Sequence, residues 1–419
     1  MKAKYIFIVL FELVWFGSYA AARDDAVNLS SLIKTARERN PEIKAAREMW
    51  QSKVFLIVPA GTAPDLNLGF MWENMEPGEN SLSGAGMEML SLSQKYPFFG
   101  KLSIRSKIAR SESEIYGYLY QDIARCVISS LKKAYYDVSY YQKAIEIYEE
   151  MSEILKHDSR VAEQKYRAGK EKQMNVLKAQ VELARILDEI LTLKNKKYTA
   201  QVAINVLLDY PAARPLGRVE TPEHEEFDFE RELIAQAVLL HSPALKAVFA
   251  AKEKADKLTA LARMGYLPDF MFTYKRRYMP EGFSGWDFGL NVNLPLYFWK
   301  QRGDIKSQTA NASAMENNYK NMENKIIYSM EHVLTQIDTY SRLYDLYKTN
   351  FIPQAEQAWK VAQIGYRAGQ VDFIDLLDAE RSYLSFQIKF WKYCTEYKKY
   401  LAELEQIAGK DISELKEEK

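Results

Sequence analysis

The chain of 419 residues contains few of the residues on which metal and covalent chemistry depend. Its two cysteines, Cys126 and Cys394, exclude a disulfide-dense scaffold and a cysteine-rich zinc fold. Four histidines leave little room for a histidine-based metal site. The sequence contains no phosphate-binding loop, nucleophile elbow or cluster of metal ligands. We therefore expect neither an enzyme nor a cofactor-dependent protein.

Net charge, helix breakers and long apolar runs are also scarce. The 57 basic and 56 acidic residues give a net charge of +1, which does not favour a nucleic-acid partner. The 18 glycines and 13 prolines form about 7% of the chain, against roughly 12% in average proteins, which favours long helices. Beyond residue 22 there is no run of 18 or more apolar residues, so no membrane-spanning helix is expected there.

The N-terminal segment 1–22 has the features of a secretory signal. Lys2 and Lys4 precede an apolar stretch from Tyr5 to Phe16, and three alanines, Ala20–Ala22, follow it. A short basic segment, a short apolar segment and small residues at a cleavage point are typical of signal peptides. We expect residues 1–22 to be removed after Ala22.

The rest of the sequence repeats itself at an offset of about 200 residues. Tyr166-Arg167-Ala168-Gly169 recurs as Tyr366-Arg367-Ala368-Gly369. Other segments recur in the same order, among them Asn40–Ala45 with Ser242–Ala247, and Leu177–Gln180 with Leu377–Glu380. A period this long excludes the common solenoids and indicates one large duplicated unit. We place a first repeat at 23–209, a linker at 210–229, a second repeat at 230–408 and a charged tail at 409–419.

Each repeat is predicted to contain a helix, a β-hairpin, a very long helix and a shorter returning helix. Strand segments of about 10 residues show period-two alternation, as in Phe270, Phe272 and Tyr274. Long segments with apolar residues at spacings of three and four predict coiled-coil helices of about 100 Å. Pro353 should bend the second of them. The expected hairpins cover 64–97 and 267–297, the long helices 100–165 and 300–365, and the returning helices 174–208 and 373–407.

The order of these parts resembles the TolC family of outer-membrane efflux proteins. The junction Tyr96–Lys101 (Tyr-Pro-Phe-Phe-Gly-Lys) and the stretch Phe351–Glu380 carry the resemblance in detail, and it covers essentially the whole mature chain. It implies a mainly α-helical, tandem-duplicated TolC-type fold with a transmembrane β part. Each protomer of a homotrimer would then contribute four strands to a 12-stranded barrel in the cell outer membrane, and its helices to a coiled-coil tunnel in the periplasm.

The resemblance also implies partners. A periplasmic adaptor (membrane fusion protein) would join the channel to an inner-membrane pump of the RND or ABC type, in a tripartite efflux or type I secretion system. The channel itself would be a passive exit duct surrounded by outer-membrane lipid. The junction motif and the compact length favour the heavy-metal branch, and the cargo stays open between metal ions, drugs and secreted polypeptides. Methionines on the polar strand faces suit Cu(I) but are also common space fillers: Met71, Met87, Met89 and Met271.

Two groups of candidate site residues follow from the family motifs. Asp375 and Asp378 match the acidic residues that close the periplasmic end, whereas Val371 stands where related gates carry an arginine. Alternatively, both acids are solvated residues that favour the N-terminus of a helix. The candidate adaptor-docking residues at the tips are Tyr166, Arg167, Gly169, Tyr366, Arg367 and Gly369. The glycines and arginines could equally serve only to end their helices.

Two other functions, a periplasmic scaffold and a porin, explain only part of the sequence pattern. A periplasmic coiled-coil scaffold explains the heptads but not four segments with alternating apolar residues. A porin explains the strands but not the long helices. Solubility separates the alternatives, because a scaffold is soluble after lysis whereas an outer-membrane channel needs detergent.

Overall fold

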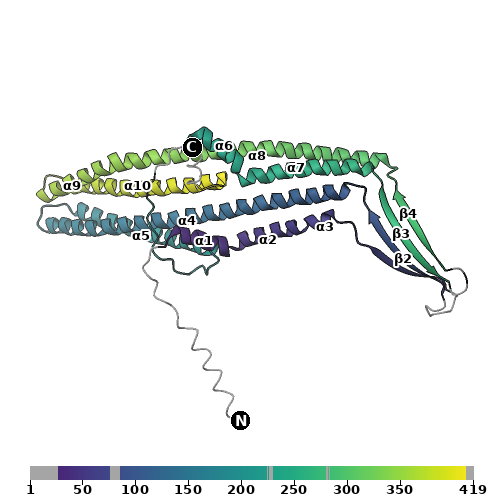
Figure 1. The fold of residues 1–419 in the computed structure, drawn as a ribbon. Coiled ribbons are helices and arrows are strands. Elements are labelled where there is room, and N and C mark those ends of the chain that lie inside the picture. The colour runs from purple at the N-terminus through teal and green to yellow at the C-terminus, as the bar shows by residue number, and fades with distance from the viewer. Residues whose placement is uncertain are drawn as a thin grey trace, which may run out of the picture.

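The computed structural model describes residues 27–75, 85–223, 225, 230–279, 282 and 284–411. The expected signal peptide and most of the charged tail lie outside this part of the chain. Figure 1 shows an elongated molecule in which long helices lie side by side and a sheet extends from one end of them. At the opposite end the chain turns back twice, once between α4 and α5 and once between α9 and α10.

The two halves of the chain contain similar successions of elements. The first half contains α1 (Leu29–Arg39), α2 (Pro41–Phe55), α3 (Ile57–Gly61), β1 (Asn67–Met75), β2 (Ala85–Tyr96), α4 (Lys101–Arg167) and α5 (Gln173–Leu207). The second half contains α6 (Arg231–His241), α7 (Pro243–Arg263), the 3₁₀ turn η2 (Met264–Tyr266), β3 (Asp269–Tyr278), β4 (Gly285–Asn293), α8 (Phe298–Leu346), the π-helical turn η3 (Tyr347–Phe351), α9 (Ile352–Ala368) and α10 (Phe373–Ala408).

Helices α1 and α6 were not anticipated from the sequence. A cap residue followed by proline separates each from the next helix, at Asn40-Pro41 and Ser242-Pro243. The Asn40 side chain accepts hydrogen bonds from the amides of Glu42 (2.9 Å) and Ile43 (3.1 Å). It therefore starts α2 while ending α1, since proline suits the first turn of a helix and disfavours helical geometry in the residue before it.

The second long helix is not continuous, whereas the first one is. Helix α4 runs for 67 residues without a break, but the π-helical turn η3 separates α8 from α9. Pro353 lies at the start of α9, where its missing N–H and its ring prevent a regular α-helical bond to the preceding turn. The wider π turn accommodates this loss. In the first half Glu153 occupies the corresponding position at an offset of 200, and the helix stays regular there.

The four strands form one antiparallel sheet in the order β1-β2-β3-β4. The central pair joins the two halves, because β2 pairs with β3. The register places many apolar residues opposite each other, as in Leu68 with Leu92, and Tyr274 with Phe288, although Arg276 lies opposite Leu90 and Trp286. The apolar face contains Leu68, Phe70, Trp72, Leu90, Leu92, Phe272, Tyr274, Phe288, Leu290 and Val292. The other face contains Asn67, Ser91, Ser93, Thr273, Lys275, Asp287 and Asn291.

Buried side chains form several clusters along the helices rather than one central core. Tyrosines contribute to them and keep their hydroxyl groups bonded, as buried tyrosines generally do. The hydroxyl of Tyr135 donates to the carbonyl of Val27 (3.0 Å), and that of Tyr397 donates to the carbonyl of Glu225 (2.9 Å). The N-terminal segment and the linker thereby become attached to α4 and α10.

Within the described residues no single helix is long and apolar enough to cross a membrane. Helices α6 and α7 meet at an angle of 47°. Only when taken together are they long and apolar enough, by length and composition.

Candidate functional site

The two helical turns at the tips have the same backbone structure. Gly169 and Gly369 adopt left-handed φ angles of 71° and 77°. In each turn the glycine amide bonds to the tyrosine carbonyl three residues back, and the following amide bonds to the carbonyl five residues back, from Lys170 to Lys165 and from Gln370 to Gly365 (both 2.8 Å). This is the Schellman arrangement, which ends a helix by using a residue that tolerates positive φ. The repeated motif is therefore a helix stop in both halves.

The tyrosines of the two motifs differ in burial. Tyr166 is 42% exposed, whereas Tyr366 is only 2% exposed. The Tyr366 hydroxyl lies 3.2 Å from Oε2 of Glu171, and the Lys165 ammonium lies 3.9 Å from the centre of the Tyr366 ring. The same ammonium donates to the Tyr366 carbonyl. Tyr366 thus joins the tip of the second half to the tip of the first.

The two arginines of the motifs lie on the outside. Arg167 is exposed and donates to Oε1 of Glu163 at 2.6 Å, one turn earlier on α4. Arg367 is also exposed, in the last turn of α9. Together with Tyr166 and the two tip glycines, these side chains form the accessible surface of the tips.

Asp375 and Asp378 lie on one accessible side of the first turns of α10. Asp375 belongs to the first turn, where a carboxylate favours the helix dipole. Oδ1 of Asp378 accepts a hydrogen bond from Nη1 of Arg381 at 3.3 Å. Both carboxylates are accessible in the single protomer, so a copy of the chain or a passing cation can approach them.

Val371 fills a space that exists because residue 365 is glycine. A Cβ at Gly365 would come within 2.5 Å of Cγ2 of Val371, which is too close for any other residue there. Val371 therefore packs against α9 and provides no charged contact at the position where related gates carry arginine.

An ion-pair network that sequence analysis missed lies one turn beyond these acids. Oε2 of Glu182 on α5 accepts two hydrogen bonds from Arg381 on α10, from Nη2 at 2.6 Å and from Nε at 3.0 Å. Arg185 lies 2.9 Å from the other oxygen. Burial alone would raise the pKa of Glu182, but the two arginines outweigh it and hold that pKa below its usual range. The sequence shows only that Asp378 and Arg381 are three residues apart on one helix. The contact of Arg381 with Glu182 depends on how α5 packs against α10, which a single sequence does not specify.

At the other end of the helices, the junction motif fixes the angle between sheet and helix. Gly100 has a φ of 90° and starts α4. The next residue, Lys101, is buried and donates to Oδ1 of Asp269 and to the carbonyl of Leu267, both at 2.8 Å. The Phe98 amide donates to the same Asp269 oxygen at 3.1 Å. The motif thus links the first half to the start of β3 in the second half.

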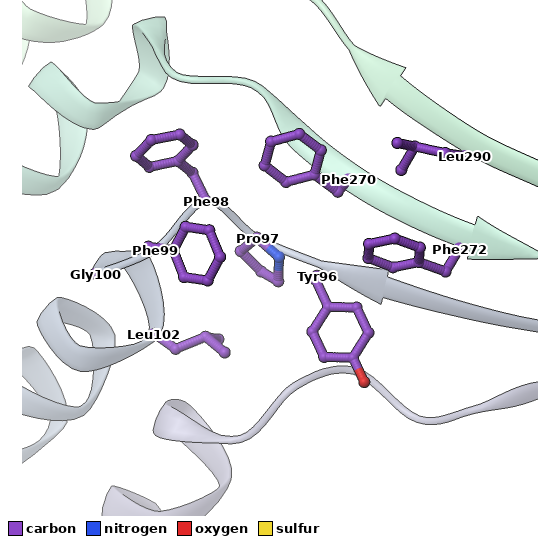
Figure 2. A pocket seen from close by; sticks show the side chains of 9 residues that line it. All are labelled: Tyr96, Pro97, Phe98, Phe99, Gly100, Leu102, Phe270, Phe272 and Leu290. Atoms are coloured by element: carbon purple, nitrogen blue, oxygen red, sulfur yellow. The ribbon is translucent and has the colours of Figure 1, made fainter.

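An aromatic groove lies beside this junction, on the apolar face of the sheet. Figure 2 shows the rings of Phe98 and Phe99 beside those of Phe270 and Phe272, with Tyr96 below them. The groove has a volume of about 520 Å³ and is lined by Tyr96, Pro97, Phe98, Phe99, Gly100, Leu102, Phe270, Phe272 and Leu290. Aromatic side chains at the end of an apolar band are typical of a membrane interface.

The methionines singled out in the sequence do not all meet. Met71 lies directly opposite Met89, and Met87 follows two residues from Met89 on the same face. Met271 lies opposite Lys95 instead. Over the part of the chain that the structure describes, no group of three or more His, Cys, Asp or Glu residues could hold a metal ion.

Comparison with known proteins relates this geometry to a family. A family model described as "Outer membrane efflux protein" matches residues 32–208 and 234–410. The cobalt-zinc-cadmium resistance protein CzcC of Cupriavidus metallidurans is 21% identical over 295 residues, which cover 70% of this chain and 69% of that protein. Two of the similar solved structures share 18% identity with this chain. The outer membrane protein VceC of Vibrio cholerae has a TM-score of 0.79 and matches 92% of this chain and 96% of its own. The Campylobacter jejuni CmeC outer membrane channel has a TM-score of 0.80, and the match covers 94% of this chain and 90% of the CmeC chain.

Proposed function

The chain belongs to the outer membrane efflux protein family, and from this premise we propose that three copies form the exit duct of a metal-efflux system. The fold is the tandem-duplicated TolC type, and the protein is an efflux channel of the outer membrane whose helical part lies in the periplasm. The single observation that carries the finer proposal is that one protomer has two kinds of uncovered surface. These are the unpaired edges of strands β1 and β4, and the exposed apolar residues of helices α5 and α9.

The sheet supports assembly through its edges. Strands β1 and β4 are the outer strands of the four, and no strand within the described residues pairs with their outer sides. Exposed edges of this length invite pairing with another chain. Pairing β4 of one copy with β1 of the next makes a head-to-tail contact, which closes into a ring when the rotation allows it. Three copies then give twelve strands, with the apolar face towards lipid and the polar face towards the duct.

The helices support the same head-to-tail arrangement. On α5, Met174, Leu177 and Val181 lie exposed at helical spacing. On α9, Val361 and Ile364 are exposed in the same way. Apolar stripes of this kind on neighbouring helices are typical of a coiled-coil interface. We infer that α5 of one protomer packs against α9 of the next.

The proposed cargo is a divalent metal cation. The relative CzcC is named for cobalt, zinc and cadmium resistance, and its similarity extends over 70% of this chain. In a ring of three copies, the accessible Asp375 and Asp378 carboxylates would form rings of negative charge, which attract cations and repel one another. We propose that these acids close the duct at its periplasmic end and select for cations.

The accessible tips are the proposed contact for a periplasmic adaptor, which links the duct to an inner-membrane pump. Arg167, Arg367, Tyr166 and the two tip glycines are available for this contact, whereas the buried Tyr366 supports them from inside. The duct itself carries out no bond chemistry in this proposal. Replacing Arg167 and Arg367 by alanine should reduce efflux while leaving the assembly intact.

The native mass of the detergent-extracted, full-length protein tests the assembly. We expect the mass of three chains, and dissociation when Val181→Asp and Ile364→Asp are combined. Gln180→Asp, an exposed polar position beside Val181, is the control and should leave the trimer intact. A detergent-independent monomer or dimer would favour the coiled-coil scaffold instead.

Growth of cells that lack the protein tests the cargo. We expect increased sensitivity to zinc, cadmium or cobalt, restored by the wild-type gene but not by the dissociating variant. Sensitivity confined to organic drugs would contradict the metal proposal while leaving the channel assignment intact.

A further inference from the structure

A row of ion pairs joins α4 of the first half to α10 of the second and to Asp411, just beyond the end of α10. Along the two antiparallel helices the pairs are Arg125–Asp411, Lys132–Glu405, Lys133–Glu403 and Asp137–Lys399. Arg125 and Asp137 are separated by the same number of residues as Lys399 and Asp411. The two segments therefore pair in a constant antiparallel register. Each of these pairs joins opposite charges.

Towards the tips the same interface brings together two acids. Asp158 on α4 and Glu380 on α10 lie within hydrogen-bonding reach of each other. They are almost completely buried, with 2% and 4% of their surfaces exposed. Two carboxylates offer only acceptor oxygens, so no hydrogen bond can form between them unless one carries a proton. Two buried like charges in contact would also repel strongly.

The neighbouring groups do not neutralise both acids. On α9, Nε1 of Trp359 lies 3.4 Å from Oε1 of Glu380. On α4, Nδ1 of the half-exposed His157 lies 3.1 Å from Oδ1 of Asp158. The second oxygen, Oδ2 of Asp158, is buried, and no donor in the described residues reaches it. Tyr366 of α9 also interacts electrostatically with Asp158.

The two arginines of the neighbouring network are engaged elsewhere. Glu182 on α5 adds a third negative charge near Glu380. Arg381, which follows Glu380 on α10, bonds to Glu182 and to Asp378, and Arg185 also bonds to Glu182. These two arginines balance Glu182 rather than the buried pair.

We propose that Asp158 and Glu380 form a proton-binding site that joins the two halves of the chain beside the tips. One proton is shared between the two carboxylates, and its O–H donates from one acid to the other. The site rests on the packing of α4 against α10 within one protomer and requires neither the trimer nor a metal cargo. It makes the joint between the halves dependent on pH.

The direction of this dependence follows from the burial of Glu380. Burial, followed by the contact with Asp158, raises the pKa of Glu380 from 4.5 to about 8. A raised pKa in the folded state means that the bound proton stabilises the fold. This stabilisation is fully present below the unfolded pKa and is lost progressively as the pH rises from there to the folded pKa. The joint is therefore strongest in acid, weakens through neutral pH, and changes no further above about pH 8. Between the two pKa values each pH unit shifts the opening equilibrium about tenfold.

Hydrogen exchange of the full-length protein in detergent tests the site. After correction for intrinsic exchange, amides of α4 and α10 around Asp158 and Glu380 should lose about a hundredfold of their protection between pH 6 and pH 9, with the loss levelling off above about pH 8. In Glu380→Gln, which mimics the protonated acid, protection should change less than twofold. Glu403→Gln removes a more exposed ion pair of the same interface. In this variant the protection should depend on pH as it does in the wild type.

A second readout detects the proton directly. The infrared band of a protonated carboxyl group should be present at pH 6, disappear near pH 9, and be absent in Glu380→Gln. Asp158→Asn should reduce the pH-dependent loss of protection without abolishing it, because Glu380 stays buried, and it replaces Glu380→Gln if that variant does not fold. An equal pH dependence in wild type and variants would overturn the proposal. Zinc-dependent protection of wild type at pH 9, absent from the variants, would also overturn it by assigning the pair to a metal cation.

Discussion

Lys165 and Tyr366 lie in opposite halves of the chain and are joined by two contacts at the tips. The lysine ammonium lies 3.9 Å from the centre of the tyrosine ring and also donates to the tyrosine carbonyl. The residue that corresponds to Lys165 in the second half is Gly365, against which Val371 packs. The duplicated tips are therefore not interchangeable, because one provides the cation and the other provides the ring.

Replacing Lys165 by methionine should loosen the connection between the tips. The variant keeps the apolar stem but loses the cation–ring contact, worth about 0.5–2 kcal/mol, and one hydrogen bond, worth about 1 kcal/mol. Hydrogen exchange in the turns after α4 and α9 should accelerate in both halves. Arg167→Met, at an exposed position bonded within α4, is the control and should leave the second turn unchanged. Equal amide exchange rates in the turn after α9 for Lys165→Met and Arg167→Met would show that Lys165 does not join the two tips.

Removing the acids of α10 should change conduction. Asp375→Ala combined with Asp378→Ala should raise the conductance of the purified channel in a lipid bilayer, or lower its preference for cations, because rings of negative charge are lost. The fold should persist, since the Asp378–Arg381 contact is exposed and such pairs contribute less than about 1 kcal/mol. Asp338→Ala, an accessible acid on α8, is the control. Unchanged conductance and selectivity would contradict the gate.

The tip glycines should resist substitution despite the open space around them. Alanine at Gly169 or Gly369 meets no neighbouring atom, yet it would have to adopt a left-handed φ, which costs about 1–2 kcal/mol. Gly303→Ala provides a matched control, because Gly303 lies inside α8 with equally open surroundings, and alanine there should stabilise the helix by about 1 kcal/mol. Thermal unfolding of the three variants measures the contrast. A stabilised tip variant would contradict the helix-stop interpretation.

Breaking the Lys101–Asp269 pair should destabilise the joint between sheet and helices. Lys101→Met leaves Asp269 poorly compensated, and removing one partner of a buried pair costs about 3–5 kcal/mol. This pair is nearly buried, so the loss should approach the lower end of that range. The more exposed pair Arg277–Asp287 in the same sheet is the control, and Arg277→Met should cost less. Equal losses in thermal stability would show that Lys101 is an ordinary surface residue.

Much of the architecture was predictable from local patterns. Alternation within strands depends only on neighbouring residues, and the structure places Phe272 and Tyr274 on one face with Thr273 on the other. The fold class and the outer-membrane efflux family were likewise predicted correctly. The helix stop at Gly369 is also a local signal, although its role in adaptor docking stays a prediction.

The contacts between elements were not predictable in the same way. Glu182–Arg381 and Asp158–Glu380 depend on the register between long helices, which a single sequence does not specify. The burial of Tyr366 could not be distinguished from the exposure of Tyr166, because the two motifs are identical in sequence. Equivalent sequence motifs acquired different surroundings once the halves packed together.

The π-helical turn before Pro353 has a consequence for the length of the two halves. The stretch from the junction lysine Lys101 to Tyr166 is shorter by a single residue than the corresponding stretch from Lys300 to Tyr366. A π turn holds one residue more than an α turn and bulges locally instead of rotating everything beyond it. The turn η3 thus absorbs the additional residue of the second half. The two tips can consequently end at the same level although their helices are built from unequal numbers of residues.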